Sequence, residues 1–124
     1  MKVLALDYGS ARTGVAVSDP TGTVARPVTT VERVGTDAGF AKLLAVIAAE
    51  TPELVVVGMP LTLRGTEGEQ ARETTAFVAR LRAAVDSPVE TYDERFTSVL
   101  ADGDDARAAA HLLASYLEWQ SARR

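Results

Sequence analysis

The chain has 124 residues, of which 47% are apolar, and its formal net charge is −4. This length fits one domain with one hydrophobic core, and we expect residues 1–124 to form it. The sequence has no run of about eighteen apolar residues that could cross a bilayer, and no cysteine for a disulfide or a zinc-thiolate site. We therefore expect a cytoplasmic protein with no membrane partner. The acidic balance argues against a protein held on nucleic acid by overall charge, because such proteins usually carry a basic face.

Three strands joined by short turns come first in the chain. The sequence predicts strands over residues 2–8, 13–18 and 23–31, with a strong turn signal at residues 19–22. Short turns between successive strands are typical of an antiparallel meander. Pro27 indicates an edge position for the third strand, because proline cannot donate a ladder hydrogen bond.

Helices and strands then alternate. The sequence predicts helices over 36–50 and 68–85, strands over 54–57 and 89–92, and a last helix that begins near Asp104 or Asp105. The wholly apolar strand 54–57 is typical of a strand buried on both faces of a parallel sheet. The order β-β-β-α-β-α-β-α predicts an α/β fold with a mixed five-stranded sheet, made of three antiparallel strands and two α-β units, with helices on both faces.

Four acidic residues lie at the ends of the predicted strands or at the start of the last helix, where α/β sheets usually form their binding sites. Asp7 ends the first strand, Asp93 and Glu94 end the last strand, and Asp105 starts the final helix. If strands one, four and five are parallel neighbours, these acids converge on one edge of the sheet. Oxygen ligands without cysteine or paired histidines suit Mg²⁺ or Mn²⁺. Two such ions about 3.5–4 Å apart can activate a water and stabilise the leaving oxygen of a phosphodiester.

Each acid also has an ordinary structural interpretation. Asp7 precedes a glycine and can form a turn, and Asp93 and Glu94 can be a solvated strand end beside Arg95. Asp105 can serve as a helix cap. Adjacent strand residues point to opposite faces, so only one of Asp93 and Glu94 can face Asp7. We favour Glu94, because its longer side chain can reach a metal from beyond the end of the strand.

The segment from Asp7 to Val17 allows a second interpretation. A glycine-bearing hairpin that follows an acid can bind phosphate through backbone N–H groups. Sugar kinases and heat-shock ATPases related to actin use a similar hairpin on nucleotide phosphates. Such enzymes need a second, matching domain to close over ATP, which 124 residues cannot supply. An actin-like ATP-binding domain is therefore the less favoured alternative.

Five landmarks follow one another along the chain. They are Asp7-Tyr8-Gly9 with Gly14-Val15-Ala16-Val17-Ser18, Ala25-Arg26-Pro27, Val57-Gly58-Met59-Pro60-Leu61 with Gly65-Thr66, Asp93-Glu94-Arg95-Phe96-Thr97-Ser98, and Asp105 ahead of Ala108-Ala109. Taken in this order, over nearly the whole chain, they resemble the YqgF family. That family is described as pre-16S ribosomal RNA nucleases and as Holliday junction resolvase-like proteins.

The resemblance implies an RNase H-like fold shared with the RuvC resolvases, and a cytoplasmic nuclease of ribosome biogenesis or nucleic-acid processing. The catalytic acids of the family carry over to Asp7, to Glu94 or its neighbour Asp93, and to Asp105. The chain departs from the family between Ser98 and Asp105, where only residues 99–104 stand in place of a longer segment with a lysine-bearing loop. This departure puts the grip on substrate, and contacts between subunits, in question.

Two functions remain open at this stage. The first is a nuclease that cuts RNA, such as the 5′ end of pre-16S rRNA, or branched DNA with metal-activated water. The second is a non-catalytic nucleic-acid or ribosome-associated module with the same fold. Three carboxylates packed together favour the nuclease, because their repulsion is costly without a cation. We expect Arg12, Arg64 and Arg95, in loops near the same edge, to contact nucleic acid. A homodimer is compatible with the sequence.

Overall fold

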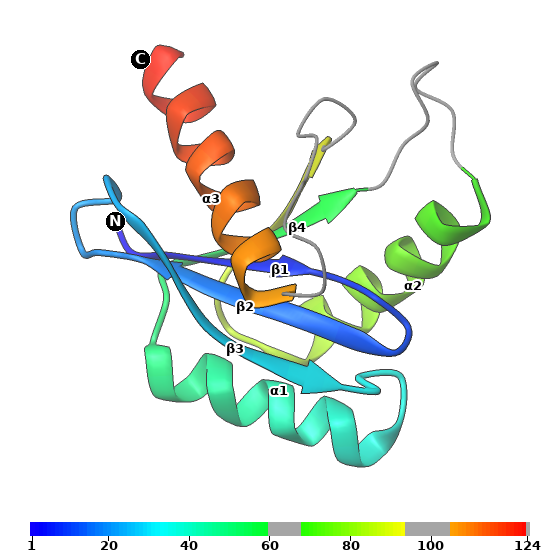
Figure 1. The fold of residues 1–124 in the computed structure, drawn as a ribbon. Coiled ribbons are helices and arrows are strands. Elements are labelled where there is room, and N and C mark those ends of the chain that lie inside the picture. Colours follow the sequence, from blue (N-terminus) through cyan, green and yellow to red (C-terminus); the bar gives the residue numbers. More distant parts are fainter. Residues whose placement is uncertain (60–67, 94–104, 124) are drawn as a thin grey trace.

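The computed structural model describes residues 1–59, 68–93 and 105–123, and its architecture is a five-stranded sheet with helices on both faces (Figure 1). The elements are β1 (Val3–Asp7), β2 (Arg12–Ser18), β3 (Ala25–Glu32), α1 (Asp37–Glu50), β4 (Leu54–Met59), α2 (Glu69–Ala84), β5 (Val89–Asp93) and α3 (Asp105–Ala122). Their order along the chain confirms the predicted alternation of strands and helices. No helix in these three described ranges is long and apolar enough to cross a membrane.

The strands lie in the order β3-β2-β1-β4-β5. β1 pairs antiparallel with β2, and β2 pairs antiparallel with β3, which confirms the meander. β4 pairs parallel with both β1 and β5, so the strands that end in Asp7 and Asp93 run parallel on either side of β4. β3 is an edge strand, and its register with β2 shifts between Val15 and Ala16, which pair with Thr29 and Pro27. The proline therefore lies at an irregularity of an edge strand, as expected.

Side-chain alternation gives the sheet two buried faces. The face with Leu4, Leu6 and Val57 packs against α1 and α2, through residues such as Phe40 and Phe77. We call it the α1/α2 face. The other face has Val3, Ala5, Ala16 and Val56, and it packs against Ala109, Leu112, Leu113, Tyr116 and Leu117 of the last helix. We call it the α3 face. Each strand therefore sends alternate residues into two separate cores.

Local signals explain where some elements begin and end. The Thr36 hydroxyl accepts a hydrogen bond of 3.1 Å from the Gly39 N–H, which caps α1 as predicted. Most bounds differ from the prediction by one or two residues, and two of these differences bear on the site. β4 continues past Val57 to Met59, and β2 begins at Arg12, which was expected in a loop. Pairing with β5 and β3 extends both strands, because Gly58 pairs with Tyr92 and Arg12 pairs with Glu32.

Candidate active site

Asp7 lies at the carboxyl end of β1, on the α3 face. Alternation along β1 places it on the same side as Val3 and Ala5, and its neighbour Tyr8 stacks on Phe77 on the opposite side, with ring centroids 4.6 Å apart. Across the antiparallel pairing Asp7 lies opposite Gly14. On its other side, the pairing of Leu6 with Val57 brings Gly58 next to it. Asp7 is therefore flanked by a glycine on both neighbouring strands.

Gly14 allows the last helix to start directly above this point. A Cβ atom at Gly14 would lie 1.7 Å from the backbone oxygen of Asp105 and 3.0 Å from the backbone nitrogen of Ala106. Any side chain there would collide with the helix backbone. The first turn of α3 thus rests on bare β2 backbone and brings Asp105 beside Asp7. Gly14 is one of the landmarks of the sequence, and a glycine inside a strand is a signal of close backbone approach that could have predicted this contact.

The surroundings of Asp7, including Asp105, destabilise its negative charge. Burial, and to a lesser extent the nearby charge of Asp105, raises the pKa of Asp7 from 3.8 to about 6. Both effects disfavour the ionised carboxylate. The Nε atom of Arg12 lies 3.0 Å from Oδ2 of Asp105 and supplies partial compensation. Asp7 and Asp105 thus form a pair of carboxylates that a cation would stabilise.

Arg12 stands at the start of β2, at the same edge of the sheet. Its side chain is 57% exposed, and its partner Asp105 is 28% exposed. The sequence predicted Arg12 as a contact to nucleic acid. In the structure it forms an ion pair with an acid of the site, which leaves much of its guanidinium accessible to solvent.

Of the remaining predicted residues, Asp93 is the one that lies in the described part of the chain. β5 alternates so that Val89 packs into the core of the α1/α2 face and Tyr92 against the core of the α3 face. Asp93 continues the Val89 side, opposite to Asp7. Glu94, Arg64 and Arg95 lie outside the described residues. Within residues 1–59, 68–93 and 105–123, no group of three or more acidic, histidine or cysteine side chains is placed to hold a metal ion.

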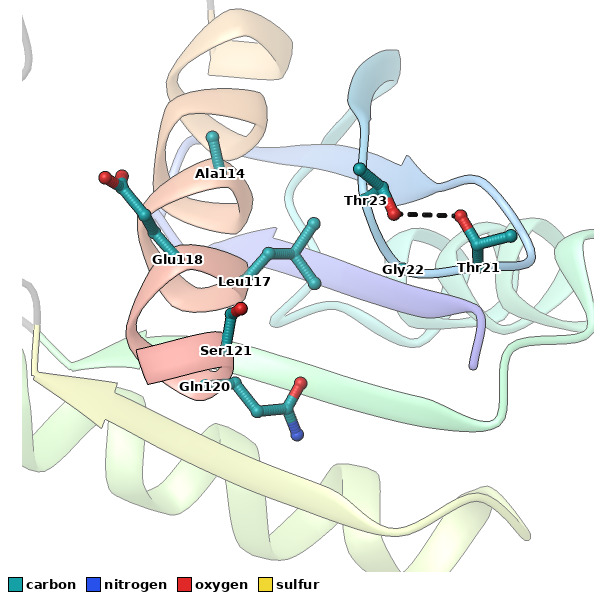
Figure 2. Close-up of a pocket in the computed structure, with 8 residues that line it drawn as sticks. All are labelled: Thr21, Gly22, Thr23, Ala114, Leu117, Glu118, Gln120 and Ser121. Carbon is teal, nitrogen blue, oxygen red and sulfur yellow. Dashed lines mark hydrogen bonds between the residues drawn. The ribbon is translucent and has the colours of Figure 1, made fainter. Parts of the chain in front are cut away.

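A cavity of about 450 Å³ lies far from these acids. Figure 2 shows it between the β2–β3 turn, at Thr21, Gly22 and Thr23, and the last turns of α3. The turn follows Ser18, whose hydroxyl accepts a hydrogen bond from the Val3 N–H at the start of β1. The cavity therefore belongs to the opposite end of β1 from Asp7. It plays no part in the chemistry of the acids.

A family profile described as RuvX, Holliday junction resolvase, matches residues 1–119. The chain belongs to the RuvX family. A relative from Oleidesulfovibrio alaskensis is 39% identical over 139 aligned positions, covering 100% of this chain and 96% of the relative. A relative from Chloroflexus aggregans is 42% identical over 100 residues, covering 81% of this chain and 70% of the relative. Both carry the name "Putative pre-16S rRNA nuclease". The resemblance to the YqgF family, another name for the RuvX family, is confirmed.

The alignment also bears on the length of the chain. Its 139 positions exceed the 124 residues here by 15, so this chain lacks 15 positions that the Oleidesulfovibrio relative has. A shorter chain agrees with the prediction that the segment before Asp105 is shortened. The place of the missing positions stays a prediction.

Solved structures show the same fold. RuvC of Thermus thermophilus, in complex with a Holliday junction substrate, superposes with a TM-score of 0.62 at 18% identity, covering 98% of this chain and 96% of that one. A fowlpox virus resolvase, in complex with Holliday junction DNA, gives a TM-score of 0.56 at 10% identity, covering 97% and 99%. The predicted RNase H-like fold, shared with RuvC, is confirmed.

Proposed function

We propose that this member of the RuvX family is a divalent-metal-dependent nuclease that hydrolyses phosphodiester bonds in the 5′ region of pre-16S rRNA, in branched DNA, or in both. The family and the names of its relatives support a nuclease, which is a hydrolase. One structural observation carries the proposed site: Gly14 lets α3 approach so closely that Asp105 lies beside Asp7 at the carboxyl end of β1. We further propose that it acts in the cytoplasm, where its ribosomal substrate would be made.

The donor chemistry of these residues fits Mg²⁺ or Mn²⁺. Asp7 and Asp105 offer only carboxylate oxygens, which hard divalent cations prefer. Burial and the nearby charge of Asp105 raise the pKa of Asp7, and a bound cation would offset both effects. Glycines on both neighbouring strands keep Cβ atoms away from Asp7. When bound, two such ions would activate a water and stabilise the leaving oxygen of a phosphodiester.

We assign Asp7, Asp105 and Glu94 to hold the metal. Glu94 is preferred to Asp93 because Asp93 continues the α1/α2 face of β5, away from Asp7. Arg12 would neutralise Asp105 before the metal arrives and then contact a substrate phosphate, with Arg64 and Arg95 completing a basic rim. Such a rim would bind the phosphates of nucleic acid locally, although the chain as a whole has a net charge of −4.

A cleavage assay with matched substrates tests the proposal. Wild-type protein and the Asp7→Asn variant are incubated with the 5′ region of pre-16S rRNA and with a four-way DNA junction, in Mg²⁺, Mn²⁺ or EDTA. We expect wild-type cleavage of at least one substrate with metal, none in EDTA, and none by Asp7→Asn. Sequencing the product ends shows which substrate is cut and whether cutting is internal. Tight binding without cleavage under any metal would instead identify a non-catalytic binding module.

A further inference from the structure

A second cluster of side chains lies on the α3 face, between α3 and the edge strand β5. Tyr92, Tyr116 and Trp119 have ring centroids 5.4 to 5.7 Å apart. Tyr116 is 2% exposed, whereas Trp119 is 42% exposed and is among the exposed large apolar residues of the described chain. Two rings of the cluster are thus anchored in or against the core, and the third reaches solvent.

Polar groups surround the exposed ring. A cavity of about 310 Å³ is lined by Glu90, Tyr116, Trp119, Gln120 and Arg123. The Arg123 guanidinium lies 4.5 Å from the centroid of the Trp119 ring. The Tyr116 hydroxyl donates a hydrogen bond of 3.1 Å to Glu90, and the hydroxyls of Tyr92 and Ser115 lie 2.9 Å apart. Hydrogen bonds therefore hold the two tyrosines of the cluster in place, while the exposed Trp119 ring carries the Arg123 guanidinium on its face.

The cluster is connected to the acids across the sheet. Tyr92 pairs with Gly58, and Gly58 lies next to Asp7. Neighbouring strands lie about 4.8 Å apart, so the Tyr92 backbone is about 10 Å from that of Asp7 on the same face. Between them stands Gly58, which has no side chain. Along α3, Trp119 follows Asp105 by fourteen residues, or about 21 Å of helix.

We infer that Trp119 and Arg123 bind an unpaired nucleobase of the nucleic acid whose backbone is cut beside Asp7. The inference rests on the proposed nuclease function. Proteins bind unpaired bases by stacking them on aromatic rings and on guanidinium planes, and by placing arginine near the phosphates. A base takes the position of Arg123 over the Trp119 ring, and the guanidinium moves to the flanking phosphate. About six stacked nucleotides, at about 3.4 Å each, span the distance to the acids.

The single tryptophan of the chain makes the test specific. Wild-type protein is titrated with a labelled twelve-nucleotide single strand in Ca²⁺ buffer. Label anisotropy reports binding anywhere on the protein, and fluorescence excited at a wavelength that tyrosine does not absorb reports Trp119 alone. We expect quenching of Trp119 in parallel with the anisotropy change. A three-nucleotide strand should bind more weakly than the twelve-nucleotide strand, because three stacked nucleotides cover only about 10 Å and cannot reach both Trp119 and the acids.

Variants separate stacking from loss of structure. Trp119→Ala should weaken binding of the twelve-nucleotide strand about tenfold, whereas Trp119→Phe should retain most of the affinity. Val24→Ala is the matched control, because Val24 is also an exposed apolar residue, 62% accessible, on the β2–β3 connection. It should bind like the wild type. Melting temperatures of all three variants show whether weaker binding of Trp119→Ala reflects a damaged fold, in which case Trp119→Phe decides.

Each contrary outcome has its own meaning. An anisotropy change without quenching, together with unchanged affinity of Trp119→Ala, overturns the inference and leaves the nuclease proposal intact. A Trp119 emission that depends on protein concentration without any strand shows that a second copy of the chain covers the cluster, which also overturns it. No binding of any nucleic acid by the wild type, and no cleavage, removes both the inference and the proposed function.

Discussion

Asp7 and Asp19 lie at opposite ends of the antiparallel strands β1 and β2 and show two uses of a carboxylate. Asp19 follows β2 and accepts hydrogen bonds from the Thr21 side chain and from the N–H groups of Val24 and Thr23, at 2.8 and 2.7 Å, which hold its pKa below its usual range. Asp7 is partly buried next to Asp105, and its pKa rises to about 6. No donor within the described residues forms a hydrogen bond with its carboxylate. Asp19 thus shapes a turn, whereas the negative charge of Asp7 is destabilised by its surroundings.

The direction of the pKa shift distinguishes an acid that shapes a turn from one that belongs to a site. Proteins retain an electrostatically unfavourable group where it serves a purpose, so a raised carboxylate pKa at a strand end points to a site. A lowered one with several local donors points to turn formation. Both residues are aspartates at strand ends close to a glycine, at Gly9 and Gly22, so local sequence does not separate them.

The largest expected effect comes from removing each charge in turn. Asp7→Asn should lower the rate of metal-dependent cleavage by about 10³-fold or more. The substitution removes a metal ligand, and the bound metal stabilises the charge of the transition state by several kcal/mol. Asp19→Asn should cleave at a rate close to that of the wild type but melt at a lower temperature, since Asn replaces one of the two acceptor oxygens by an NH2 group and removes the negative charge. Steady-state cleavage assays measure the activity of both variants, and thermal unfolding measures their stability. Equal activity of wild type and Asp7→Asn would show that Asp7 is a turn residue.

A second pair of variants asks which acid of the adjacent pair belongs to the site. Glu94→Gln should lose metal-dependent cleavage by about 10²-fold or more, whereas Asp93→Asn should mainly lower stability, because Asp93 lies on the α1/α2 face. Single-turnover cleavage in Mg²⁺ and urea unfolding of both variants provide the comparison. The reverse result would assign the metal ligand to Asp93.

The approach of α3 to β2 can be broken without touching any acid. Gly14→Ala places a Cβ against the backbone of Asp105. We expect a stability loss of about 1–3 kcal/mol and a cleavage rate lower by about 10²-fold, because Asp105 moves relative to Asp7. Gly35→Ala is the control, since a Cβ there meets nothing within 4 Å. If Gly14→Ala is destabilised but cleaves normally, the close approach serves packing alone.

The pH dependence of stability should have opposite signs for the two aspartates. The pKa of Asp7 is higher in the folded state than its ordinary value of 3.8, so the folded protein binds more protons between about pH 4 and 6. Its contribution therefore favours folding below pH 4 and is lost as the pH rises through 6. In EDTA at pH 7, Asp7→Asn should be more stable than wild type by about 1–3 kcal/mol. Asp19, with its lowered pKa, stabilises above pH 4 and loses its effect in acid.

Urea unfolding at several pH values between 4 and 8 measures this difference. The gap between Asp7→Asn and wild type should open across this interval and close again when Mg²⁺ is added. A gap that is independent of pH would show that the carboxylate of Asp7 does not titrate in this range.

The fold was predictable because each strand and helix carries its own apolar pattern. The run Leu54–Val57 indicated a buried parallel strand, and the positions of Asp7 and Asp105 at element ends then located the site. Contacts between distant segments were not predictable in the same way. The role of Gly14 depends on where α3 crosses β2, and the extension of β4 through Gly58 depends on pairing with β5.

The aromatic cluster was missed for a similar reason. Tyr116 and Trp119 are three residues apart on one helix, which is a visible signal of a shared face. Their meeting with Tyr92 of β5 required the packing of α3 on the sheet. The pairing of Arg12 with Asp105 is likewise a tertiary contact, so sequence alone suggested a free basic loop where the structure has an ion pair.

The smallest expected effect concerns that ion pair, in which two consequences oppose each other. Arg12→Ala removes a competitor for Asp105 and should tighten Mn²⁺ binding, yet the side chain is 57% exposed, and exposed pairs contribute about 0–1 kcal/mol. The gain in metal affinity should therefore stay below about fivefold. Loss of a phosphate contact should weaken nucleic-acid binding and reduce the salt slope by about one. Titration calorimetry with Mn²⁺ and binding of a four-way junction at several salt concentrations separate the two. An unchanged salt slope, with tighter Mn²⁺ binding, would leave Arg12 as a partner of Asp105 alone.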